Sequence, residues 1–82
     1  MTNNEIEKVL YEILKDSIAV KVELVAQTAL LRDGILDSMD FMNYLVAIED
    51  RFSVRIPEED VETHQLGIIG NMANYLHDRL KK

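Results

Sequence analysis

Cysteine is absent from the 82 residues, and its absence removes three kinds of chemistry at once. The chain forms no disulfide, offers no thiolate to a metal ion and has no cysteine nucleophile. A domain this small must then be stabilised by packing alone. Any thiol chemistry has to come from a group that the chain does not encode.

Long apolar runs are also missing. No stretch approaches the roughly 20 residues needed to span a bilayer. The segment 1–7 is polar and acidic, whereas a signal peptide begins with basic residues followed by apolar ones. We therefore expect a cytoplasmic protein without a membrane span.

Basic side chains are few compared with acidic ones. Nine Lys and Arg residues stand against fifteen Asp and Glu residues, which leaves a formal net charge of −6 at pH 7. A charge of this sign is repelled by the phosphates of nucleic acids, so we expect no nucleic-acid partner. Proteins with basic surfaces are the partners that this charge favours.

What is present indicates one folded domain over residues 1–82. The composition is 48% hydrophobic and 29% charged, as in ordinary globular chains. The length is too short for two separate cores and excludes most self-contained enzymes. We expect a monomer that is not an enzyme.

Apolar periodicity predicts three main helices and one short helix, hence an all-α, small four-helix bundle. The first covers residues 5–14 and begins near residues 3–5, where Thr2 and Glu5 have capping-box spacing. The second covers 38–52, which contain no Gly or Pro, and its predicted buried stripe is Phe41, Leu45, Ile48 and Phe52.

The second half of the chain supplies the other two helices. Pro57 suits the first turn of a short helix over 58–62. Gly67 and Gly70 flank the start of a last helix, which ends in basic residues and has an apolar face made of Ile69, Met72, Ala73, Leu76 and Leu80.

The segment 17–36 is predicted to be a long ordered loop between the first two main helices. Arg32-Asp33-Gly34 is a turn signal, and a loop of this length is often functional. Its apolar side chains are expected to pin it to the core: Val22, Leu24, Leu30, Leu31 and Leu36.

The start of the second helix is chemically well marked. Asp37 is a good N-cap, and Asp40 is expected to reach back in a variant of the capping box. Ser38 between them is expected to present an accessible hydroxyl. The alternative is that Asp37 and Ser38 only cap the helix.

The whole pattern resembles the acyl carrier protein family. The resemblance rests first on Leu-Asp-Ser-Met-Asp at 36–40, which follows a long loop and opens a helix. Supporting features are Phe52, the segment Val-Arg-Ile-Pro-Glu at 54–58 and the last helix at 69–76. The resemblance covers nearly the whole chain.

This resemblance implies that Ser38 receives a covalent 4′-phosphopantetheine arm from coenzyme A. A phosphopantetheinyl transferase makes the bond, and Asp37 and Met39 are implied to take part in its recognition. The terminal thiol of the arm then carries cargo as a thioester between enzymes, so the chain supplies position and the cofactor supplies the chemistry.

The second helix is also expected to dock partners: the transferase, a loading enzyme for acyl or aminoacyl groups, and downstream transferases or synthases with basic surfaces. Methionine adapts to varied surfaces and carboxylates attract basic ones. The candidate docking residues are Asp40, Met42, Val46, Glu49 and Asp50.

Two departures leave the cargo open. Asn43 stands where carriers of fatty acid synthesis commonly have an acidic residue. The segment Gly-Ile-Leu-Asp-Ser-Met at 34–39 places the glycine three residues before Asp37, which looks more like D-alanyl and other aminoacyl carriers. The alternative cargo is therefore aminoacyl or peptidyl in a specialised pathway.

Other candidates are weaker. His64 and His77 lack metal-ligand spacing, so no metal site is predicted. The acidic run at 58–62 is a solvated helix face or an extension of the docking surface.

A rival class is a helical interaction module without a prosthetic group, in which Ser38 is only a cap. A hydrolytic serine is disfavoured, because no histidine is near it in sequence and the chain is too small to build a substrate cleft easily.

Overall fold

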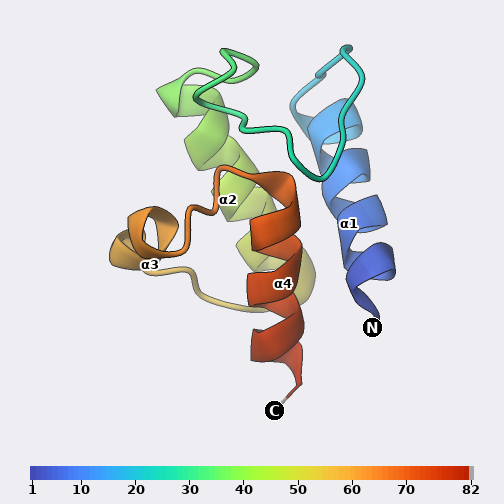
Figure 1. Cartoon of the computed structure of the whole chain (residues 1–82), viewed down its shortest axis with the longest axis vertical. Helices are drawn as coiled ribbons and strands as arrows, with labels where there is room; N and C mark the ends of the chain where they lie inside the picture. Colours follow the sequence, from blue (N-terminus) through green and yellow to red (C-terminus); the bar gives the residue numbers. More distant parts are fainter. Residues whose placement is uncertain (82) are drawn as a thin grey trace.

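The helices follow the order that the periodicity predicts. A computed structural model describes residues 1–81, and over these residues the fold is a small all-α bundle with three main helices and one short helix (Figure 1). The elements are α1 (Asn3–Glu12), the π-helical turn η1 (Ile13–Ser17), α2 (Ser38–Phe52), α3 (Glu58–Thr63) and α4 (Ile69–Leu80).

The capping box at the start of α1 is confirmed. The Thr2 Oγ1 accepts a hydrogen bond from the Glu5 N–H at 3.2 Å, and the Glu5 Oε1 accepts one from the Thr2 N–H at 2.8 Å. These bonds stabilise the charged carboxylate and lower the pKa of Glu5.

The first helical segment continues beyond the predicted end at residue 14. In η1 the Ile18 N–H bonds to the Ile13 carbonyl at 3.3 Å, one residue further back than in an α-helix. The periodicity did not indicate this π-helical turn, because the turn changes the rotation of only a few residues.

The core lies between the apolar stripes of α1, α2 and α4, with the long loop supplying further side chains. On α2 the predicted stripe needs correction. Tyr44 is fully buried, whereas Leu45 and Phe52 are only partly buried, because the face that meets the neighbouring elements is centred on Phe41, Tyr44 and Ile48. Leu80 is exposed, since it is the last residue of α4.

The loop from 17 to 36 is ordered and packs on the core, but two of its predicted anchors are wrong. Leu30 and Leu36 are buried and Leu24 is partly buried, whereas Val22 and Leu31 are 53% and 44% exposed. Residues 30–34 form a turn, in which Leu30 enters the core and Leu31 faces solvent.

Backbone hydrogen bonds hold the loop against the start of α4. Ala29 and Ile68 form an isolated antiparallel bridge, and the Gly70 N–H donates to the Ala26 carbonyl at 2.8 Å. A Cβ atom at position 70 would lie 3.1 Å from that oxygen, so glycine permits the close approach. Gly34 has a φ of 72°, as the predicted turn requires.

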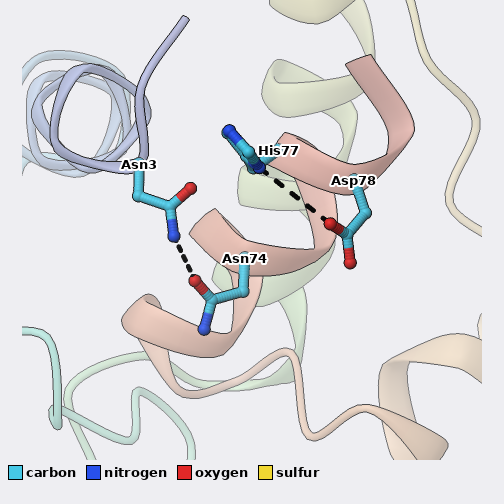
Figure 2. Close-up of polar contacts among 4 residues, drawn as sticks. All are labelled: Asn3, Asn74, His77 and Asp78. Atoms are coloured by element: carbon cyan, nitrogen blue, oxygen red, sulfur yellow. Dashed lines mark hydrogen bonds and ion pairs between the residues drawn. The ribbon is translucent and has the colours of Figure 1, made fainter. Parts of the chain in front are cut away.

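Both ends of the described chain lie at the end of the bundle opposite to the start of α2 (Figure 1). Figure 2 shows one contact near this end, where the Asn3 side-chain amide of α1 donates a hydrogen bond to the Asn74 side-chain oxygen of α4. The first turn of α2 is therefore kept away from both termini.

Candidate functional site

The first turn of α2 is built as the sequence predicts, with one difference. Asp37 has an extended backbone, and its Oδ1 accepts a hydrogen bond from the Asp40 N–H at 2.8 Å. No reciprocal bond from the Asp40 carboxylate to the Asp37 N–H is present in residues 1–81. The expected variant of the capping box is thus half formed, because Asp is one methylene shorter than the Glu of a complete box.

Ser38 is the first residue of α2, and its side chain is exposed. The cap of α2 is formed by Asp37, so the Ser38 hydroxyl is not used as a capping group. The positive end of a helix stabilises a nearby anion, and free backbone N–H groups there suit phosphate. The residues present at this position therefore fit a phosphodiester.

Exposed apolar side chains follow along the outer face of α2. Met39, Met42 and Val46 are 73%, 66% and 61% exposed, and they recur at helical spacing opposite the buried face. Asp50 continues the same face and is exposed. The structure thus brings four of the predicted site residues into one stripe beside Ser38.

The other two predicted docking residues are half-buried. Asp40 lines a surface hollow at the start of α2. Glu49 accepts a hydrogen bond from the Ile56 N–H through Oε2 at 2.7 Å, so its carboxylate holds the chain between α2 and α3. Sequence reasoning missed this structural role, since the two residues are seven positions apart and lie on different segments.

A polar cluster between α3 and α4 was also missed. The Tyr75 hydroxyl donates to Asp60 Oδ2 at 2.6 Å and accepts from Arg79 Nη1 at 3.1 Å. Arg79 Nη2 donates to the Arg55 carbonyl at 2.7 Å. Burial, followed by the hydrogen bond to Asp60, raises the pKa of Tyr75 to about 12.

The two histidines have separate neighbours. The His64 ring lies 5.4 Å from the Tyr75 ring, between centroids. The His77 Nδ1 lies 3.9 Å from Asp78 Oδ1, as Figure 2 shows. Within residues 1–81, no group of three His, Asp or Glu side chains has an arrangement suited to a metal ion.

Comparison with known proteins decides the family. A family model described as a phosphopantetheine attachment site matches residues 8–76. The chain belongs to the acyl carrier protein family. An acyl carrier protein of Buchnera aphidicola subsp. Schizaphis graminum is 30% identical over 96% of this chain and 99% of that protein. One from Campylobacter jejuni subsp. jejuni is 35% identical over 99% of this chain and 97% of that protein.

No solved structure matches the chain significantly. As a member of the acyl carrier protein family, the protein carries acyl groups on a covalently attached 4′-phosphopantetheine. That role implies contacts with transferases and synthases. None of the helices in the described part of the chain has the length and apolar character to cross a membrane.

Proposed function

We propose that Ser38 is the residue that bears the phosphopantetheine arm. The observation that carries the proposal is an exposed hydroxyl at the positive end of α2, left free because Asp37 caps the helix. In the transfer, the Ser38 oxygen bonds to the phosphorus of coenzyme A next to the pantetheine, and the bond to the nucleotide breaks. The hydroxyl proton passes to a base on the transferase.

Asp37 and Met39 flank the hydroxyl and are the proposed recognition residues for the phosphopantetheinyl transferase. Asp37 is exposed and has one side-chain oxygen engaged with the Asp40 N–H, which leaves the other available to a partner. Met39 is the most exposed of the large apolar side chains in residues 1–81. The Ser38 oxygen therefore has a carboxylate, Asp37, before it in the sequence and an exposed apolar side chain, Met39, after it.

The outer face of α2 is proposed as the docking surface for the transferase, the loading enzyme and the enzymes that take the cargo. Exposed Met and Val side chains supply adaptable apolar area, and Asp50 supplies charge for a basic groove. Asp40 and Glu49 add negative charge at the edges of this face. The successive partner enzymes would each bind to this same face of α2.

The chain itself is proposed to catalyse no step. It presents the thioester, whose reactivity comes from the cofactor thiol. Aminoacyl cargo is a second candidate, and the observation that favours it is the position of Gly34 three residues before Asp37, where the glycine occupies the left-handed backbone region.

The test is intact mass after incubation with coenzyme A and a broad-specificity phosphopantetheinyl transferase. We expect one phosphopantetheinyl addition on the wild type and none on Ser38→Ala. The variant should stay within about 0.5 kcal/mol of wild-type stability, because Ser38 forms no cap. Absence of the addition on folded wild-type protein would instead support an interaction module that uses α2 without a prosthetic group.

A further inference from the structure

Exposed basic side chains gather at the end of the bundle opposite to Ser38. Arg51 lies in the last turn of α2, Arg55 lies on the segment between α2 and α3, and Arg79 and Lys81 lie at the end of α4. Both α2 and α4 end on the side of the bundle where the termini lie (Figure 1). We call these four residues the basic cluster. The net charge of the chain is −6, so the composition alone does not lead us to expect it.

The fold assembles the basic cluster from segments that are far apart in sequence. The helix dipole favours a cation at the end of a helix, which accounts for Arg51 and Arg79 taken singly. Arg55 lies outside the helices, and the hydrogen bond from Arg79 Nη2 to the Arg55 carbonyl at 2.7 Å holds its segment against α4. The dipole therefore does not account for the cluster as a whole.

Arg79 is exposed, yet its guanidinium is held in place. Nη1 donates a hydrogen bond to the Tyr75 hydroxyl at 3.1 Å, and Cζ lies 5.4 Å from the centroid of the Tyr75 ring. Both oxygens that accept from Arg79 are uncharged, so the positive charge is fixed without being neutralised. A side chain that is already ordered loses little entropy when it binds a partner.

The basic cluster has no carboxylate partner within residues 1–81, since none of its side chains forms an ion pair there. Three carboxylates near this end of the bundle already have other neighbours, namely Glu49 with the Ile56 N–H, Asp60 with the Tyr75 hydroxyl and Asp78 with His77. Guanidinium groups bind carboxylates through pairs of hydrogen bonds. The cluster is therefore open to acidic groups of another molecule.

We propose that the basic cluster is a second docking surface, which binds an acidic patch on an enzyme that loads or receives the cargo. This inference rests on the proposed docking of such enzymes to the outer face of α2. Arg51 directly follows Asp50, so the cluster continues that face and reverses its charge. From Ser38 to Arg51 the helix rises about 20 Å. The acidic patch of the enzyme then lies at a similar distance from the entrance that admits the arm.

Two signs of charge along one surface select partners more strictly than one sign does. An enzyme whose docking surface is basic throughout is repelled where it meets the basic cluster. An enzyme that is basic near the arm entrance and acidic further along is attracted at both places. The cluster therefore determines which carrier-dependent enzymes bind, while Ser38 and the start of α2 serve all of them.

A protein partner fits the basic cluster better than an anionic membrane does. The cluster adjoins the proposed docking face of α2, so one enzyme can cover both surfaces. A bilayer of anionic lipids attracts cations, but it also repels a chain with a net charge of −6. The membrane is accordingly an alternative that the experiment has to exclude.

The experiment titrates the isotope-labelled, phosphopantetheinylated full chain with octaglutamate, a defined acidic probe, and follows the backbone amides by NMR. We expect octaglutamate to shift the amides of residues 51–55 and 79–81 and to leave those of residues 39–46 in place. Added salt should weaken this binding, because exposed charges are screened. Shifts spread evenly over the chain, or no binding at low salt, would overturn the proposal.

A double variant, Arg51→Gln with Arg55→Gln, should weaken octaglutamate binding by about five-fold or more, because two exposed ion pairs are lost. The matched control, Lys15→Gln with Lys21→Gln, makes the same change of net charge on exposed residues outside the cluster. It should weaken binding by less than about two-fold, since distant exposed charges are screened. Equal losses in the two double variants would show that only net charge matters, which overturns the proposal.

Vesicles of phosphatidylglycerol test the membrane alternative by co-sedimentation. We expect the wild-type chain to stay in the supernatant. Binding to these vesicles that the arginine double variant loses and the lysine control keeps would assign the basic cluster to a membrane surface and overturn the enzyme partner.

Failure of this inference is distinguishable from failure of the proposed function. If no phosphopantetheinyl mass appears on Ser38, the proposed function falls and the enzyme partner falls with it. If the mass appears on wild type and both double variants, but octaglutamate does not distinguish the variants, only the role of the basic cluster falls. Should the arginine double variant fail to fold, Arg55→Gln alone, compared with Lys21→Gln, decides the question.

Discussion

Asp37 and Glu49 are both acidic residues of the predicted site, but their carboxylates make different contacts in the structure. Asp37 caps α2 beside the exposed Ser38 hydroxyl. Glu49 bonds the Ile56 N–H and stabilises the connection to α3. The capping role of Asp37 is local and was predicted from neighbouring residues. The role of Glu49 depends on where the chain returns, so it emerged only from the fold.

Substitutions at Asp37 separate capping from recognition. Asp37→Ala should lower the free energy of unfolding by about 1 kcal/mol, because it removes the N-cap, whereas Asp37→Asn keeps a capping oxygen and should cost only a few tenths. Both should slow phosphopantetheine transfer if the charge at this position is recognised. Urea denaturation and the rate of mass addition measure the two effects. Wild-type transfer by Asp37→Asn would leave Asp37 with the capping role alone.

At the scale of elements, α2 combines a buried face with an exposed apolar one. Phe41, Tyr44 and Ile48 face the core, while Met39 and Val46 face solvent. The two sets lie on opposite sides of one helix, because the positions of one set are rotated about half a turn around the helix axis from those of the other. One element therefore provides stability through one face and carries the proposed docking surface on the other.

Charge reversal on the outer face of α2 tests docking. Asp50→Lys should slow the transfer reaction and weaken its dependence on salt, without loss of helicity, because an exposed acidic residue steers a basic partner. Glu12→Lys makes the same charge change on an exposed residue of α1 and serves as the control. Equal rates for the two variants would show that only net charge matters and would remove Asp50 from the docking surface.

The short helix α3 depends on polar contacts, since none of its own residues is buried. The bond from the Tyr75 hydroxyl to Asp60 ties it to α4, and Arg79 extends the contact to the carbonyl of Arg55. Elements with few buried apolar contacts open at lower free energy than the core. We therefore expect α3 to be the least protected helix.

Tyr75→Phe should make the local opening of α3 more frequent, while the rest of the bundle stays folded. Loss of one hydrogen bond, worth about 1 kcal/mol, predicts roughly five-fold faster amide exchange over residues 55–65. Amide exchange in α1 should be unchanged. The matched control is Tyr11→Phe, which removes a tyrosine hydroxyl bonded to Glu7 on α1 and should leave the exchange of residues 55–65 unchanged. A uniform rise across all helices would mean that the hydroxyl supports global stability and not the attachment of α3.

At the scale of the whole molecule, packing alone stabilises a small core. The radius of gyration is 11.4 Å, against about 12 Å expected for a compact chain of this length. No cysteine supplements this packing. All three tyrosines are in contact with the packed interior to some degree, and burial is the main cause of the raised pKa of each.

This burial predicts a loss of stability in alkali. The pKa values of Tyr11 and Tyr75 are raised from 10.0 to about 12, so the unfolded chain releases these protons at lower pH than the folded chain. Their contribution to stability is complete below pH 10 and is lost as the pH rises from 10 to 12. Urea midpoints across this range should fall, and less steeply in Tyr75→Phe. A flat profile would contradict the raised pKa values.

Several local features follow from the amino-acid sequence alone: the helices, the capping box at Thr2, the cap at Asp37 and the exposed hydroxyl of Ser38. These features depend on the spacing of apolar residues and on capping contacts between residues a few positions apart, and both can be recognised in the sequence. The contacts between side chains of different elements depend on the three-dimensional fold. The bond from Glu49 to Ile56, the tie from Tyr75 to Asp60 and the unpaired hydroxyl of Tyr44 depend on how helices approach one another, and periodicity carries no information about that approach.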